Sequence, residues 1–362
     1  AGNEGYRETT MDDLKAAPMP LAQKVVLALA AVGVVVMFVA SHVDYHIFHK
    51  FAWPIMAVTV VLLIVVLFMP ELNGAKRWIF LPIGGNLQPS EVAKFAVIVL
   101  FAHIISINHK RMKTFAYGVL PFVVILGVIA GLMLLEPHLS GTVLILGIGG
   151  LMMFVGGTGL VWFGLAIAGV VAGVAGAVVL VPDLVPYAMS RIESWQNPWL
   201  DAQGDGHQII QSMYAIGSGG LTGLGIGNSK QKHLYLPEPQ NDFIFSVICE
   251  ELGFIGAIAV LVLLAAIILR IVINGKRAND NASYLMCMGM ASMLAAQVII
   301  NIGMVLQWLP VIGITLPFFS AGGSSNLCVY IGIGLMMSIY RFNQKTPVAN
   351  FRLQRVVTRF ST

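Results

Sequence analysis

Charged residues are scarce in this chain of 362 residues, where Asp, Glu, Lys and Arg together make up 10%. Soluble domains carry about 25% of such residues, whereas apolar residues reach 57% here. The apolar residues come in blocks long enough to cross a bilayer, which takes about 20 residues per helix. The blocks lack the alternation of an outer-membrane barrel strand. This composition excludes an ordinary soluble domain and predicts an all-α polytopic integral membrane protein.

Cysteines and common catalytic signatures are also scarce. The three cysteines, Cys249, Cys287 and Cys328, lie inside apolar blocks, so no disulfide framework is expected. The chain has no phosphate-binding loop, no H-E-x-x-H zinc pair, no C-x-x-C pair and no G-x-S-x-G elbow. It also lacks a basic, aromatic groove pattern, so no nucleic-acid partner is expected.

Hydropathy predicts nine transmembrane helices. They cover roughly residues 21–41, 51–69, 92–107, 116–135, 141–157, 160–182, 243–272, 284–308 and 326–340. Between the sixth and the seventh lies one large loop, residues 183–242, rich in Gly, Pro, Asn and Trp. No internal repeat is found, so an inverted-repeat transporter has no support.

Basic residues set the predicted orientation. With nine spans, the clusters at 110–113, 270–277 and 341–359 fall on one side, which the positive-inside rule makes cytoplasmic. Three histidines on that side, at positions 42, 46 and 49, are expected to lie at the interface without carboxylate partners.

The domain organisation follows from this orientation. Residues 1–20 form a polar extracytoplasmic flank, residues 21–340 form the transmembrane domain, and residues 341–362 form a basic cytoplasmic tail. Loop 183–242 is then extracytoplasmic. Lys76 and Arg77 also fall outside, against the rule, and therefore need a reason to be there.

Asp242 is the first candidate for chemistry, because it ends the long loop and precedes an apolar helix. Partial desolvation at a membrane boundary raises the pKa of a carboxyl group toward that of a useful general base. The alternative interpretation is an N-cap of the helix that follows.

A second candidate is the stretch QPSEVAK at 88–94. Ser90 suits an N-cap, and Glu91 and Lys94 share one helix face, where they can pair. Such a pair anchors the helix or serves function; the pattern alone does not decide between them.

Other ionisable residues have two interpretations each. Arg77 suits phosphate or simple interfacial anchoring. Glu136 lies in a predicted outer turn together with His138. Glu250 and Glu251, inside the seventh span, are functional candidates or buried structural acceptors. In the Gly/Ser-rich loop at 313–326, Ser324 and Ser325 could cap the last span.

Several long motifs resemble those of the SEDS family (shape, elongation, division and sporulation), and its FtsW/SpoVE branch in particular. The matching stretches are KRWI at 76–79, QPSEVAK at 88–94, EPHLSGTVL at 136–144, NPWLDAQGDGHQIIQS at 197–212, GGLTGLGIGNSKQKHLYLPEPQNDFIF at 219–245, EELGFIGA at 250–257 and GITLPFFSAGGSS at 313–325. They follow the order of the family from about residue 25 to the C-terminus.

The resemblance implies a peptidoglycan glycosyltransferase of the bacterial cytoplasmic membrane that polymerises lipid II. It implies a class B penicillin-binding protein and other division proteins as partners, besides membrane lipid. The acidic residue of the family's DFIF motif, here Asp242, is expected to be catalytic. The substrate-binding residues are expected to be Glu91, Lys94, Arg77, Gln88, Glu136, Lys232, Ser324 and Ser325.

The implied reaction is an inverting transfer on the outer face, in which Asp242 takes the proton of the attacking sugar hydroxyl and undecaprenyl pyrophosphate leaves. Lys94, Arg77 or a divalent cation such as Mg²⁺ would stabilise the leaving group. No metal ligands are identified. Two rival interpretations are a lipid II flippase and a non-catalytic scaffold for the penicillin-binding protein.

The chain departs from the family pattern in two ways. The family usually has ten spans, and block 21–41 matches its second, so a first span is expected to be missing from this sequence. Ala321 stands where the family usually has Tyr.

Overall fold

The computed structural model describes residues 21–71, 76–80, 86–136, 138–169, 193, 195–202, 204, 206–231, 236 and 240–345, with side chains described from Ala30 to Gln344 within these ranges. The predicted flank at 1–20 and most of the predicted tail at 341–362 lie outside the described residues.

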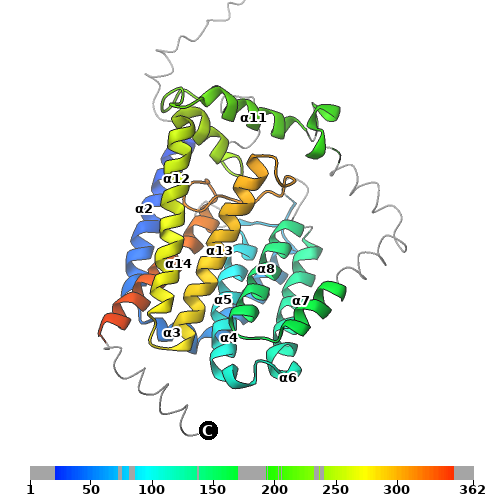
Figure 1. The fold of residues 1–362 in the computed structure, drawn as a ribbon, viewed down its shortest axis with the longest axis vertical. Coiled ribbons are helices and arrows are strands. Elements are labelled where there is room, and N and C mark those ends of the chain that lie inside the picture. Colours follow the sequence, from blue (N-terminus) through cyan, green and yellow to red (C-terminus); the bar gives the residue numbers. More distant parts are fainter. Residues whose placement is uncertain are drawn as a thin grey trace, which may run out of the picture.

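Long helices lie side by side as a bundle (Figure 1). They are α2 (Leu21–His42), α4 (Ala52–Val66), α5 (Pro89–Asn108), α7 (Leu120–Leu135), α8 (Leu139–Val155), α12 (Ile244–Lys276), α13 (Asn281–Val305) and α14 (Gly323–Lys345). A further apolar helix covers Leu160–Gly169. Five helices of the described part are long and apolar enough to cross a membrane. The all-α polytopic class is therefore confirmed, and the count of nine spans stays a prediction.

Helix α5 forms the centre of the bundle, where it packs against α4, α8 and α13. Its side chains from Ala96 to Ala102 are fully buried. By contrast, α12 leaves apolar side chains such as Ile255 and Val262 63% exposed. Lipid tails are as apolar as these side chains, so such exposure carries no penalty in a membrane.

The two ends of the bundle differ in composition and structure. One carries α3 (Tyr45–Lys50), η1 (His109–Arg111) and α6 (Phe115–Gly118). We call it the basic end after its cations, which include Lys50, Lys110, Arg111, Lys113, Arg270, Lys276, Arg277 and Arg341.

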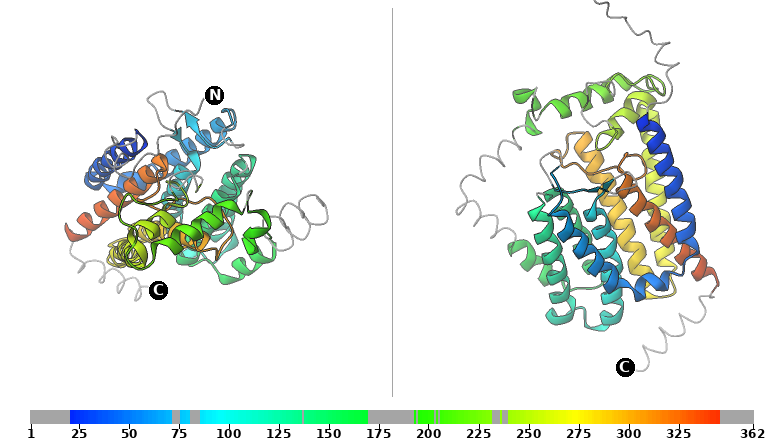
Figure 2. Two further views of the ribbon diagram at one scale, coloured as in Figure 1. Left: turned by 90° about the horizontal axis from the view of Figure 1, so that it is seen from above. Right: turned by 180° about the vertical axis from the view of Figure 1, so that it is seen from behind.

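The opposite end, which we call the loop end, carries η2 (Pro198–Asp201) and α11 (His207–Gly219), and α11 lies across the bundle (Figures 1 and 2). A two-stranded antiparallel hairpin between α4 and α5, formed by β1 (Ile79–Phe80) and β2 (Asn86–Leu87), was not predicted.

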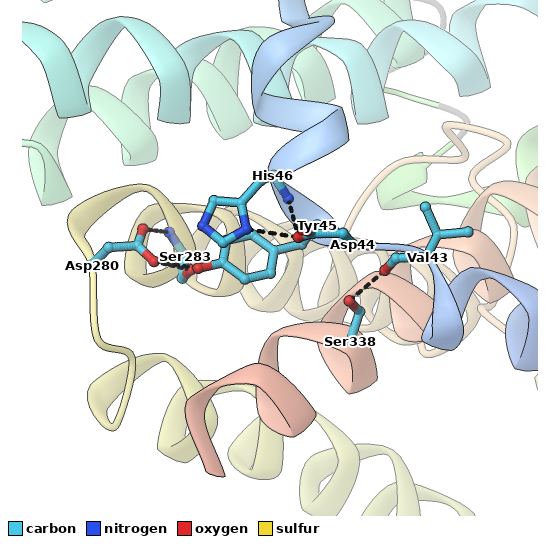
Figure 3. A network of polar contacts seen from close by, with 7 residues as sticks. All are labelled: Val43, Asp44, Tyr45, His46, Asp280, Ser283 and Ser338. Carbon is cyan, nitrogen blue, oxygen red and sulfur yellow. Dashed lines mark hydrogen bonds and ion pairs between the residues drawn. The ribbon is translucent and has the colours of Figure 1, made fainter. Parts of the chain in front are cut away.

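A polar network at the basic end joins the turn after α2 to α13 and α14 (Figure 3). The hydroxyl of Tyr45 donates to Asp280 at 2.6 Å. Asp280 is the N-cap of α13 and accepts from the backbone N–H of Ser283 at 2.7 Å. The hydroxyl of Ser338 on α14 donates to the carbonyl of Val43 at 2.6 Å. The network thus fixes how three helices meet.

One expectation for this end is wrong. His46 has a carboxylate partner, because its Nδ1 lies 2.6 Å from Oδ1 of Asp44 (Figure 3). Asp44 also accepts from the backbone N–H of His46 at 2.9 Å, as the N-cap of α3. The contact arises because a capping carboxylate lies beside the first turn of the helix that it caps.

Helix α12 is kinked at Gly253, whose backbone (φ 67°, ψ −171°) is not helical. The segment after α11 bonds to the peptide groups around the kink. Four backbone bonds join them: Leu224 N to Glu250 O, Gly225 N to Glu251 O, Phe254 N to Gly220 O and Ile255 N to Leu221 O. A Cβ on Gly253 would lie 2.3 Å from the nitrogen of Gly223, so only glycine fits this close approach.

Candidate active site at the loop end

Asp242 lies just before α12, one residue ahead of the N-cap position. The N-cap position is Phe243, so the N-cap interpretation of Asp242 is wrong. The side chain is half-buried and lies against Gly313, where a Cβ would be 3.1 Å from Oδ2 of Asp242. Gly313 has a φ of 69°, so glycine suits both its conformation and the space beside the carboxylate.

A buried amide on α13 positions the backbone of Asp242. Asn301 is fully buried, and its Nδ2 donates to the carbonyls of Asp242 at 2.8 Å and Ile314 at 2.7 Å. One side chain therefore joins the start of α12 to the loop before α14. A polar side chain inside an apolar helix is costly unless it is bonded in this way.

The loop before α14 is also bonded to the residues that precede Asp242. Ser320 donates to the carbonyl of Asn241 at 2.6 Å, and the backbone N–H of Ala321 donates to the carbonyl of Gln240 at 2.7 Å. The Ala321 contact uses backbone alone, so the smaller side chain at this position does not remove it.

Glu91 and Lys94 form an ion pair in the first turns of α5. Their Oε2 and Nζ atoms are 2.6 Å apart, with side chains 10% and 5% exposed. The predicted cap at Ser90 is wrong, because Gln88 holds the N-cap position and Pro89 opens the helix. A carboxylate in the first turn is favoured by the helix dipole, but burying both charges costs free energy.

Gln88 connects three helices around this pair. Its backbone N–H donates to the hydroxyl of Ser324 on α14 at 3.3 Å. Its side-chain amide lies 3.3 Å from Nε2 of His138, which precedes α8. The hydroxyl of Ser325 lies 2.9 Å from that of Thr315. Both serines are therefore tied to residues around the site.

Glu136 and His138 are buried at the end of α7, with exposed fractions of 1% and 6%. Among the described residues, neither carboxylate oxygen of Glu136 has a hydrogen-bond partner. Burial raises the pKa of Glu136 to about 7, although Arg77 acts in the opposite direction. Burial, with the charges of Arg77 and Lys94, lowers the pKa of His138 to about 3. His138 is therefore a neutral imidazole at physiological pH.

The raised pKa of Glu136 makes stability depend on pH. Between about pH 4.5 and pH 7, the folded chain keeps a proton that the unfolded chain releases. Rising pH therefore lowers the stability across this window, and the effect is constant above it. Glu136→Gln should remove the effect. The melting temperature of the variant minus that of the wild type should therefore increase as the pH rises from about 4.5 to 7. Thermal unfolding in detergent measures this, with the exposed Glu71→Gln as control; parallel curves for Glu136→Gln and wild type would contradict the assignment.

Glu250 is a structural acceptor. It is 1% exposed and accepts from the hydroxyl of Ser229 at 2.5 Å and from the backbone N–H groups of Lys230 at 2.9 Å and Gln231 at 3.4 Å. Glu250 thereby anchors residues 229–231, which immediately precede Lys232 in the sequence. Lys232 itself, predicted to bind substrate, lies outside the described residues.

The contacts connect the predicted residues in two groups. In the first group, Gln88 joins the start of α5 to Ser324. The positive charges of Arg77 and Lys94 lie close enough to His138 to lower its pKa. Asp242 is joined to the loop at 313–326 through Asn301 and Gly313. That loop leads into α14, which begins at Gly323 and carries both serines.

The motifs did not predict Asn301 as a site residue, whereas His138 was predicted as a neighbour of Glu136 in the outer turn and Gly313 as part of the loop at 313–326. Asn301 had a usable signal, because a polar residue within an apolar helix is expected to be bonded or functional.

In the described part of the chain, no group of three or more His, Cys, Asp or Glu side chains gathers in a way that could hold a metal ion. Mg²⁺ usually binds through one or two carboxylates together with substrate phosphates. A divalent cation at this site would therefore take part of its ligands from a phosphorylated substrate.

Apolar helices around a buried ion pair, with polar side chains gathered at one end, define a polytopic helical membrane protein with a polar site at the loop end. The FtsW/RodA/SpoVE family model, described as "Cell cycle protein", matches residues 9–345. The chain therefore belongs to the SEDS family, as its motifs predicted.

Two relatives illustrate the likeness in sequence. Stage V sporulation protein E of Bacillus subtilis (strain 168) is 39% identical over 326 residues, which cover 88% of this chain and 86% of the relative. A protein of Trichlorobacter lovleyi named "Probable peptidoglycan glycosyltransferase FtsW" is 37% identical over 322 residues, covering 86% of this chain and 82% of that protein.

Solved structures show the same fold. A chain from a study of the "structural coordination of polymerization and crosslinking by a peptidoglycan synthase complex" superposes with a TM-score of 0.75, at 28% identity, covering 91% of this chain and 92% of that one. RodA of Thermus thermophilus superposes with a TM-score of 0.65, at 26% identity, covering 90% of this chain and 89% of that one.

Proposed function

We propose that this chain is a peptidoglycan glycosyltransferase that polymerises lipid II into glycan strands. The observation that carries the proposal is Asp242, a half-buried carboxylate that lies just before α12 at the loop end, against Gly313. The names of its relatives support the same activity.

In the proposed reaction, Asp242 accepts the proton of the acceptor sugar's 4-hydroxyl. The oxygen then forms a bond to the anomeric carbon of the donor sugar, while the bond from that carbon to the pyrophosphate oxygen breaks. Undecaprenyl pyrophosphate leaves with the electron pair, and the anomeric carbon is inverted. Proton transfer to a positioned base typically contributes about 10²–10⁴-fold in rate.

The leaving pyrophosphate requires positive charge beside it. Lys94 would supply it, with Glu91 2.6 Å away holding the ammonium group in place. Arg77 is a second cation of the same region, since its charge acts on both Glu136 and His138. Gln88, Glu136, Lys232, Ser324 and Ser325 are proposed to bind other parts of the substrate.

The proposed setting is the bacterial cytoplasmic membrane, with the basic end in the cytoplasm and the loop end outside. The cations at the basic end favour this orientation by the positive-inside rule. A class B penicillin-binding protein and other division proteins are the proposed partners. The structural relative from a peptidoglycan synthase complex, in which polymerisation and crosslinking are coordinated, supports such a partner.

The test is to mix the purified chain and a class B penicillin-binding protein and to add fluorescent lipid II as the substrate. Glycan strands on a gel and release of undecaprenyl pyrophosphate are expected. Movement of lipid II across vesicle membranes without strand formation would instead indicate a flippase. The absence of both strand formation and lipid movement would indicate a scaffold. Either result would overturn the proposal.

A further inference from the structure

A groove lies between α12 and α14 at the basic end, far from Asp242 along α12. Its volume is about 630 Å³, within the range of ligand pockets, roughly 300–1,000 Å³. Its apolar lining includes Leu263, Ile267, Ile271, Ile333, Met336 and Met337. This lining suits a hydrocarbon chain, because it offers the tail of a lipid the same environment as the bilayer.

Polar side chains join the two helices at the groove. The Nδ2 atom of Asn274 on α12 donates to the carbonyl of Met336 on α14 at 2.8 Å. Asn274 is 9% exposed and lines the groove. The bond joins the two helices at the level of the groove.

Three arginines line the same groove: Arg270 and Arg277 on α12, and Arg341 on α14. All three are exposed. Arg270 and Arg277 are seven residues apart, about two helical turns, so they lie on one face of α12. In the described part of the chain, no ion pair joins any of the three to a carboxylate. Arg341 donates to the carbonyl of Ser41 at 3.3 Å. Because this acceptor is neutral, the guanidinium group of Arg341 keeps its positive charge unbalanced.

We infer that this groove binds an anionic phospholipid of the surrounding leaflet, with an acyl chain along the apolar lining and the phosphate between the arginines. Guanidinium groups match phosphate oxygens in charge and geometry. Basic pockets between transmembrane helices are known to recognise anionic headgroups. A neutral lipid or an apolar helix would leave three unneutralised cations at the edge of the groove. The inference does not depend on the proposed catalysis.

The test uses the purified, delipidated chain in detergent and native mass spectrometry with phosphatidylglycerol or phosphatidylcholine added. The wild type should prefer phosphatidylglycerol. In Arg270→Gln/Arg277→Gln, that preference should fall about tenfold or more, since each arginine near an anionic headgroup is worth about fivefold at moderate salt. The matched control is Lys110→Gln/Lys113→Gln, which removes two cations of the same end that do not line the groove.

A second variant tests the groove independently of charge. Ala266 lines the groove, and Ala266→Trp should fill part of it and lower phosphatidylglycerol binding while the arginines remain. Equal binding of the two lipids to the wild type would overturn the inference and would favour an apolar helix or a neutral lipid as the occupant. An equal loss in the lysine control, or unchanged binding by Ala266→Trp, would overturn it as well.

Discussion

Asp242→Asn should lower the rate of glycan polymerisation by about 10²–10⁴-fold, the usual contribution of a general base. The amide keeps the shape of the side chain but cannot accept the proton of the attacking hydroxyl. The fold should be kept, because Asn301 holds the backbone carbonyl of residue 242 and not its side chain. The measurement is the initial rate of strand formation from lipid II on a gel, with the penicillin-binding partner present.

The matched control is Asp201→Asn, which removes an exposed carboxylate at the same end of the bundle. It should keep nearly the wild-type rate. Near-normal strand synthesis by Asp242→Asn would refute the assignment of Asp242 as the general base.

Lys94→Met should destabilise the chain strongly as well as inactivate it. It leaves the carboxylate of Glu91 buried without the ammonium group 2.6 Å away. Removing one partner of a buried ion pair typically costs about 3–5 kcal/mol. Thermal unfolding in detergent should show this loss, whereas Lys113→Met, at an exposed position of the basic end, should unfold like the wild type.

The double variant Glu91→Leu/Lys94→Met separates stability from function. Replacing both charges of a buried pair by apolar side chains is often neutral or stabilising. The double variant should therefore unfold near the wild-type temperature and still fail to polymerise lipid II. Recovery of activity together with stability would show that the pair only anchors α5.

The sequence predicts the helices well, because long apolar blocks in a membrane protein leave few alternatives to helix. The central position of α5 has no such signal, since its neighbours α8 and α13 are distant in sequence. The short hairpin of β1 and β2 has only two residues in each strand, too few for a periodic pattern.

In the candidate site, too, contacts within one helix can be predicted from the sequence, whereas contacts between distant segments cannot. The pairing of Glu91 with Lys94 follows from their spacing on one helix. The contact between Gln88 and Ser324 spans 236 positions, and only the packing of α14 beside α5 brings them together. The cap assigned to Ser90 failed because Pro89 favours the first helical position, which moves the cap to Gln88.

The break in α12 at Gly253 links the segment after α11 to a long apolar helix. The peptide groups freed by the break are satisfied by residues 220–225, not by the helix itself. Straightening α12 would therefore require breaking the bonds to residues 220–225, and removing that segment would leave peptide groups of α12 near Gly253 without partners. The position of the segment after α11 and the break in α12 are therefore coupled, so that a change at one requires a change at the other.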